Sequence, residues 1–172
     1  MKNYNSLLFI LVICATTSTG YTQSLEEFRI GAGATFSKSE GLDMGIGYYV
    51  SLNTTGKINN VIGYSGLLQF SNYHAKIEDI AINYYSIDPT FFFHIYPGQE
   101  KFSLLAGISS TFFIDAKVDG EDAEINQYGG MYFATGAAFN VNDKLGILAR
   151  YNIPFSDDGF DYTASVGVTY KF

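Results

Sequence analysis

The last eleven residues, 162–172, alternate strictly between two kinds of side chain. One set is apolar, with aromatic rings near both ends: Tyr162, Ala164, Val166, Val168, Tyr170 and Phe172. The other set is small or polar: Thr163, Ser165, Gly167, Thr169 and Lys171. Successive side chains of a β-strand point to opposite faces. A strand with lipid outside and water inside needs this layout, with aromatic rings at the interfaces. We therefore interpret 162–172 as the closing strand of a transmembrane β-barrel.

Seven further stretches show the same two-residue period. They cover residues 27–36, 42–53, 61–71, 82–96, 102–114, 128–141 and 145–153. About ten residues is the length that a tilted strand needs to cross a bilayer. Two positions depart from the pattern. Leu67 falls on the polar face, and Pro89, which lacks an N–H, predicts a bulge or a local break in strand pairing. Together the stretches predict an all-β protein, an eight-stranded antiparallel up-and-down transmembrane β-barrel.

A barrel in lipid must close on itself, because lipid offers no partners to backbone hydrogen-bonding groups. Eight strands leave an interior just wide enough for side chains to fill, which excludes a wide pore. The inward positions with long or charged side chains are Arg29, Asp43, Gln69, Asp88, His94, Arg150 and Lys171. Unpaired charge in the interior would be costly. We expect Arg29 and Arg150 to pair with Asp43 and Asp88 in a polar network that fills the lumen, with a gated narrow pore as the alternative.

The rival fold is a soluble, lipocalin-like barrel, in which the apolar residues would face inward. Ile46, Val50, Val166 and Val168 decide between the two folds, since the membrane barrel places them on the outside.

The first 22 residues resemble an export signal. Lys2 is followed by an apolar run at 7–15, about half of what a membrane-spanning helix requires, and then by small polar residues. We therefore expect a cleavable signal peptide at 1–22 and an outer-membrane β-barrel domain at 23–172, with a cut after Gly20 as the neighbouring possibility. The single cysteine, Cys14, lies in the apolar run, and lipidation there is the alternative to an ordinary signal residue.

The connections between the expected strands form two sets. Residues 53–60, 97–101 and 142–144 are turn-like and mostly short, whereas 37–41, 72–79, 115–127 and 154–161 make up the second set. An even strand count puts both termini on one side. With the termini in the periplasm, the second set faces outside. It holds eleven acids against Lys38, Lys76 and Lys117: Glu40, Glu78, Asp79, Asp115, Asp119, Glu121, Asp122, Glu124, Asp157, Asp158 and Asp161.

No arrangement of residues predicts a catalytic, cofactor or metal site. At the outer rim, a pair of His74 with Ser71 for acyl hydrolysis, or of His74 with Asp79, is the nearest catalytic candidate, but no fixed spacing supports it. His74 and His94 are expected at opposite ends of the barrel. The acidic segments 119–122 and 157–161 could collect Ca²⁺, yet neither has the spacing of an EF-hand loop. The formal net charge of −7 argues against nucleic-acid binding.

Four stretches together resemble a known family. They are 28–37, the segment 85–96 continuing into 102–107, the Arg-Tyr segment 148–152, and the terminal segment 162–172. In order and spacing they are similar to the small outer-membrane β-barrel proteins of Bacteroidota, the group that includes the PorT-like barrels. The chain departs from that pattern at Leu67, where the family often has an acid. The resemblance implies no shared catalytic residues, and it implies that the barrel-assembly machinery recognises the terminal strand ending in Phe172.

These observations favour a small outer-membrane protein with a structural or interaction role, in envelope integrity or as a subunit of a larger membrane assembly. A narrow channel for small solutes or ions is the alternative, and a lipid-modifying enzyme is a third hypothesis. We expect no enzyme activity, cofactor or metal. The expected partners are outer-membrane lipid and lipopolysaccharide, the barrel-assembly machinery and other outer-membrane proteins, but no nucleic acid.

Overall fold

The computed structural model describes residues 27–39, 41–98, 101–124, 128–155 and 160–172. The expected signal peptide and its cleavage site lie outside these residues. The strands are β1 (Glu27–Lys38), β2 (Gly45–Lys57), β3 (Ile62–Ile77), β4 (Ile80–Ile95), β5 (Phe102–Val118), β6 (Glu121–Asp122), β7 (Tyr128–Asn140), β8 (Leu145–Pro154) and β9 (Tyr162–Lys171). Among the described residues, no helix has the length and apolar character that a helical membrane span requires.

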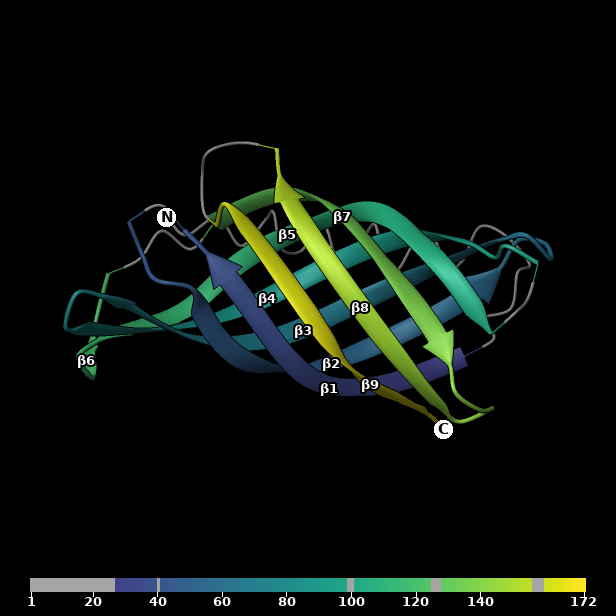
Figure 1. Ribbon diagram of the computed structural model, residues 1–172, viewed down its shortest axis with the longest axis horizontal. Helices are drawn as coiled ribbons and strands as arrows, with labels where there is room; N and C mark the ends of the chain where they lie inside the picture. The colour runs from purple at the N-terminus through teal and green to yellow at the C-terminus, as the bar shows by residue number, and fades with distance from the viewer. Residues whose placement is uncertain (1–26, 40, 99–100, 125–127, 156–159) are drawn as a thin grey trace, which may run out of the picture.

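Eight of these strands form a closed antiparallel ring (Figure 1). Each long strand pairs with the next one along the chain, and β1 pairs with β9 to complete the circle. The two-residue β6 folds back and pairs antiparallel with the last residues of β5. We call the end that holds Glu27 and Phe172 the terminal end, and the opposite end, where β6 lies, the distal end. The predicted eight-stranded up-and-down barrel is confirmed.

Side-chain exposure fixes which face of each strand points outward. Ile46, Val50, Val166 and Val168 have 54%, 52%, 45% and 54% of their surface exposed on the outside of the ring. By contrast, Thr35 of β1 points into the ring, and its side chain is fully buried. An apolar exterior around an interior with many polar groups is the arrangement that lipid requires. The lipocalin-like alternative, with these residues packed in the centre, is therefore wrong.

The strands continue further toward the distal end than the sequence indicated. β3 runs to Ile77 and β4 starts at Ile80, so the predicted loop 72–79 is mostly strand, with a tight turn at Glu78 and Asp79. Backbone pairing continues here although outward-facing residues such as His74 and Lys76 no longer carry an apolar pattern. β2 is displaced the other way, since it begins at Gly45 instead of residue 42 and ends at Lys57.

Pro89 interrupts the pairing on one side only. The β3–β4 ladder runs through the Leu68–Pro89 pair without a shift of register. The β4–β5 ladder passes from Ile87 to Thr90 without pairs at the two residues between them. The predicted local break is confirmed on that side, because proline offers no N–H to the neighbouring strand. The register shift of this ladder lies a few residues away, between Tyr85 and Ser86.

Two turns at the terminal end are held by an asparagine side chain. Oδ1 of Asn59 accepts hydrogen bonds from the backbone N–H groups of Val61 and Ile62, both at 2.8 Å. Oδ1 of Asn142 accepts from Lys144 and Leu145 at 2.9 and 2.8 Å. These bonds satisfy backbone donors that the turn leaves unpaired, which is why asparagine suits such connections.

Candidate functional site in the barrel lumen

Aromatic side chains fill the distal end of the lumen. The buried members of this aromatic cluster are Tyr73, Tyr132 and Phe160, against which Tyr84 and Phe113 pack. The ring centroids of Tyr73 and Phe160 lie 5.1 Å apart. The Tyr132 hydroxyl donates to the Gly129 carbonyl at 2.7 Å and accepts from the Phe160 N–H at 3.0 Å. These contacts hold Phe160, two residues before β9, inside the distal end of the lumen.

A polar belt centred on Asp88 lies below the aromatic cluster. The Asp88 carboxylate, 1% exposed, accepts hydrogen bonds from the hydroxyls of Ser71 at 3.0 Å, Ser86 at 3.1 Å and Thr111 at 2.8 Å. Gln69 extends the belt by donating to Ser71 at 2.8 Å. A buried carboxylate is tolerated when several donors satisfy it, and these hydroxyls supply them.

Hydrogen bonds across the lumen connect opposite walls of the barrel. Nη1 of Arg150, on β8, donates to Oγ1 of Thr90 on β4 at 2.8 Å. Oγ of Ser165, on β9, donates to Oε1 of Gln69 on β3 at 3.5 Å. The predicted interior network is thus present. The predicted direct pairing of Arg150 with Asp88 is wrong, because the guanidinium bonds the neighbouring Thr90 hydroxyl instead.

An apolar layer separates the polar belt from the terminal end. It consists of Leu67, Phe92, Leu105, Ala134 and Leu148, all at most 8% exposed. Sequence reasoning treated Leu67 as an isolated irregularity and did not single out the other members. A usable signal was present, since Phe92 stands between two phenylalanines and Leu105 follows Leu104. In a strand, consecutive apolar residues place one side chain on each face.

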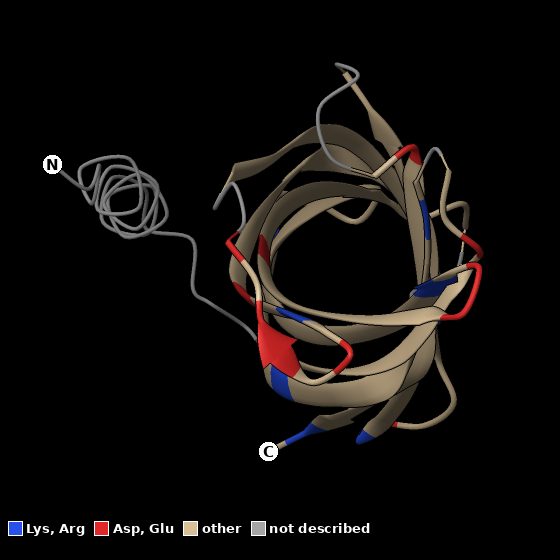
Figure 2. Ribbon diagram, turned by 90° about the vertical axis from the view of Figure 1, so that its left-hand side faces the viewer, with Lys and Arg blue, Asp and Glu red and all other residues tan. Residues whose placement is uncertain are grey.

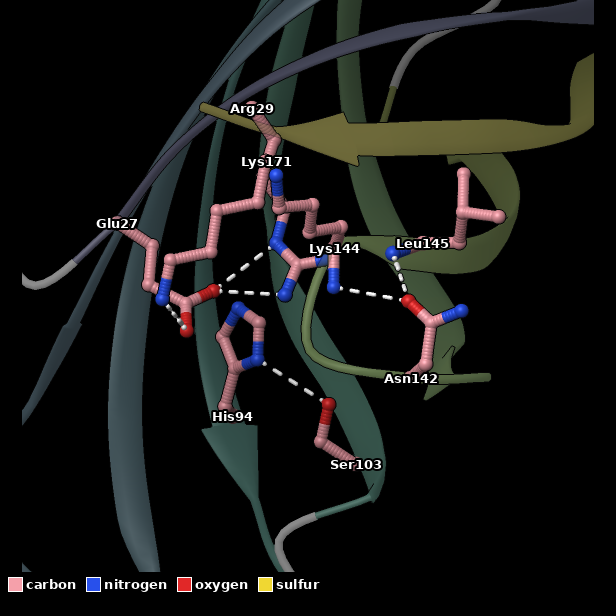
Figure 3. A network of polar contacts seen from close by, with 8 residues as sticks. All are labelled: Glu27, Arg29, His94, Ser103, Asn142, Lys144, Leu145 and Lys171. Atoms are coloured by element: carbon pink, nitrogen blue, oxygen red, sulfur yellow. Dashed lines mark hydrogen bonds and ion pairs between the residues drawn. The ribbon is translucent and has the colours of Figure 1, made fainter.

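Between the apolar layer and the terminal end lies a cavity of about 640 Å³, which we call the vestibule. Arg29 lines it and forms an ion pair with Glu27, with Nη2 and Oε2 2.8 Å apart (Figure 3). Lys171 binds the other carboxylate oxygen of Glu27 at 2.8 Å. The predicted pairing of Arg29 with Asp43 is wrong, because Asp43 is exposed before the start of β2. Glu27 was missed, although it lies two residues before Arg29 and therefore on the same face.

The two histidines lie far apart in the fold, as predicted. His94 is buried in the vestibule wall, with its ring nitrogens 3.2 Å from the Ser103 hydroxyl and 2.7 Å from that of Ser65. His74 lies on strand β3, and not in a loop as predicted, where its ring contacts the Asn83 side chain on the outer wall. Ser71, one of the two candidate partners of His74, points into the lumen, so these two residues lie on opposite faces of the strand.

The distal rim is acidic in its described parts (Figure 2). Asp119 occupies the turn between β5 and β6, where its carboxylate accepts the Ala81 N–H at 2.9 Å. Asp122 lies 3.6 Å from Lys117 in an exposed ion pair. Within the described ranges, no group of three or more histidine, cysteine or acidic side chains is arranged to hold a metal ion. Glu40 and residues 157–158 lie outside the described residues.

An antiparallel ring with an apolar exterior and a filled lumen defines the class of small transmembrane β-barrels. The chain belongs to the outer membrane protein beta-barrel domain family, whose model matches residues 6–172. It is therefore a small outer-membrane β-barrel protein, and it resides in the outer membrane. A search of curated proteins found no match to the sequence.

Solved structures of other outer-membrane barrels share the fold. Ail, the attachment invasion locus protein of Yersinia pestis, is 20% identical, with a TM-score of 0.60 over 85% of this chain and 97% of that one. Neisserial surface protein A is 19% identical, with a TM-score of 0.59 over 88% and 100% of the two chains. OprG of Pseudomonas aeruginosa is 13% identical, with a TM-score of 0.51 over 85% and 95%. At these identities the likeness concerns the fold alone.

Proposed function

We propose that the protein is a closed barrel whose role in the outer membrane is structural or interactive, in envelope integrity or as a subunit of a larger membrane assembly. The observation that carries this proposal is that side chains close the lumen between the vestibule and the distal end. The apolar layer, the polar belt and the aromatic cluster follow one another along the barrel axis. Ions would have to cross a dry layer and then break hydrogen bonds that connect opposite walls.

Single-channel recording in planar bilayers tests this closed state. We expect the wild-type protein to give no steady current, and a variant with Phe92→Ala and Leu148→Ala, which opens the apolar layer, to pass more current than wild type. Phe91→Ala is the matched control, because that ring faces outward. Discrete, reproducible conductance steps from the wild type would favour the alternative, a narrow channel for small solutes or ions.

We further propose that the protein is not an enzyme. Ser71 and His74 point to opposite faces of β3, which separates the His–Ser pair that the sequence suggested for acyl hydrolysis. The test is the lipid A composition of cells that carry His74→Ala. An unchanged profile agrees with the proposal, whereas loss of a lipid A modification would contradict it.

We also propose an orientation for the barrel in the membrane and a class of partners for its distal rim. We place the terminal end in the periplasm and the acidic distal rim outside, where divalent cations would bridge its carboxylates to lipopolysaccharide phosphates. Ail has been solved in complex with the heparin analogue sucrose octasulfate, a polyanion. An acidic rim such as this one favours cation-bridged partners. Protease digestion of intact cells tests the orientation, since cuts in the distal connections are expected and cuts at Asn59 or Asn142 would oppose it.

The finer family assignment is also proposed, namely a PorT-like barrel of Bacteroidota whose terminal strand is recognised by the barrel-assembly machinery. The Arg-Tyr segment 148–152 and the strand ending in Phe172 support it. Phe172 is 73% exposed and its ring packs beside Tyr170 and Phe28 at the terminal end. Deleting Phe172 should reduce the assembled protein in membranes, and normal assembly would contradict the recognition step.

A further inference from the structure

The vestibule has the size and lining of a ligand site. Its volume of about 640 Å³ lies within the range of about 300–1,000 Å³ that is usual for small-molecule pockets. Phe92, Leu105 and Leu148 of the apolar layer form its floor, so it is closed toward the middle of the barrel. Hydroxyl and amide side chains, among them Asn53, Thr55 and Thr169, line its walls. Such a cavity offers an apolar base and polar groups that orient a ligand.

Arg29 presents a donor to this cavity for which the described residues offer no acceptor. Nε and Nη2 of the guanidinium both bond Oε2 of Glu27, at 2.9 and 2.8 Å. Lys171 takes Oε1 of the same carboxylate, at 2.8 Å. Nη1 is buried and meets no acceptor in the described part of the chain. The Arg29 side chain is 8% exposed, and a charged group in such surroundings is costly unless its hydrogen-bonding capacity is filled.

The charge of the vestibule contrasts with that of the whole protein. Leaving aside Lys57, which has an interaction of its own, its described lining contains the three cationic residues Arg29, Lys101 and Lys171 against the two acids Glu27 and Asp143. The formal net charge of the whole chain is −7. A concave pocket with partly apolar walls strengthens the attraction between such cations and an anion.

We propose that the vestibule binds a small anionic ligand through a phosphate or carboxylate group, with Nη1 of Arg29 as its anchor. A guanidinium nitrogen is well suited to such oxygens, since charge-assisted hydrogen bonds are the stronger kind. The cavity is larger than a simple anion requires, so the ligand also carries polar groups that meet the amide and hydroxyl walls. The ligand enters from the terminal end, because the apolar layer closes the other side.

Nuclear magnetic resonance titration of the full barrel in lipid nanodiscs tests this site. The probes are sodium phosphate and sodium acetate, each against sodium chloride at constant ionic strength. The readouts are the Arg29 Nε–H signal and the backbone amides of Gly146 and Thr169. We expect saturable shifts with phosphate or acetate but not with chloride. Phosphate alone would assign the site to phosphate-bearing ligands, and both probes would assign it to anions in general.

Three variants test whether the chemical-shift changes come from an anion bound at Arg29. Arg29→Gln should weaken binding at least tenfold. Gly146→Ala keeps every charge but places a Cβ 2.8 Å from the Thr169 hydroxyl and 3.0 Å from Nη1 of Arg29, so it crowds the anchor and should also weaken binding. Lys76→Gln, the matched control, removes one positive charge at the distal end and should leave binding unchanged.

The proposal is overturned if neither probe gives saturable shifts, or if Arg29→Gln and Gly146→Ala bind like the wild type. The inference does not depend on the closed-barrel proposal. Steady current in planar bilayers would refute the closed state without affecting the titration, and a failed titration would leave the current measurement as it is.

Discussion

Nζ of Lys171 lies 2.8 Å from Oε1 of Glu27, which joins the last strand of the barrel to the first across 144 residues of sequence. Arg29 holds the other oxygen of the same carboxylate. At the terminal end, strands β1 and β9 are therefore joined by an ion pair in addition to their backbone hydrogen bonds. The same three residues form one wall of the vestibule.

Glu27→Gln should lower the free energy of unfolding by about 1–3 kcal/mol, because it leaves the largely buried Arg29 without its counter-charge. Urea unfolding in detergent micelles measures the effect. Asp122→Asn is the control: it breaks an ion pair whose acidic partner is 87% exposed, and it should change stability by about 0.5 kcal/mol or less. Equal effects of the two substitutions would show that the Glu27 contacts stabilise the barrel no more than an exposed ion pair does.

Phe92→Ala and Phe91→Ala should differ strongly although the two residues are adjacent. Phe92 is 1% exposed within the apolar layer, so its truncation leaves a cavity and should cost about 3–5 kcal/mol. Phe91 is 39% exposed on the outer wall, where lipid can occupy the vacated space. We expect less than half the effect there, measured by the same urea unfolding. A larger loss at Phe91 would contradict the assignment of the two faces.

The polar belt predicts that Asp88→Leu is more damaging than Asp88→Asn. Leucine leaves the Ser71, Ser86 and Thr111 hydroxyls without their shared acceptor, which should cost about 3 kcal/mol or more. The amide of asparagine retains one oxygen acceptor, and hydroxyls can also accept from its nitrogen. The loss should therefore be smaller. The two unfolding midpoints in urea give the comparison, and the reverse order would refute the described network.

Strand pairing between β2 and β3 depends on Gly47. A Cβ at this position would lie 1.6 Å from the Asn72 carbonyl oxygen, a backbone atom of the paired strand. Gly47→Ala should therefore destabilise the barrel by about 1–3 kcal/mol or more and reduce heat-modifiable gel mobility. Gly66→Ala is the matched control, because the nearest atom is the movable Thr54 hydroxyl at 3.3 Å. Similar behaviour of both variants would contradict the close approach at Gly47.

The architecture could be predicted from the sequence because the outward face of each strand reports directly on its surroundings. Outward residues such as Val166 and Val168 are apolar and exposed. A soluble protein rarely exposes so large an apolar surface, so these side chains must meet lipid. The alternation ends where the outward residues become polar, as at His74 and Lys76. The extra length of β3 and β4 beyond the apolar band therefore left no periodic signal.

The lumen was predicted less well, because most of its contacts join residues distant in sequence. Alternation placed Asp88 and Arg150 inside, but their partners depend on the stagger of strands around the ring, and Arg150 reaches Thr90 across the lumen. Arg29 is different, since it bonds Glu27 two residues away, which alternation alone places on the same face. The apolar layer was missed for a related reason. Leu67 alone does not indicate a layer, because the other four side chains come from four other strands that meet it only in the folded ring.

The central claim is that the apolar side chains of each strand face lipid while their neighbours fill the lumen. Nitroxide labels on single cysteines at Ser165, Val166, Val168 and Thr169 measure this directly in lipid vesicles, since the sole natural cysteine is Cys14. We predict that lipid-dissolved oxygen relaxes the labels at Val166 and Val168 strongly and those at Ser165 and Thr169 weakly. Equal relaxation at all four positions, or the opposite alternation, would contradict the account.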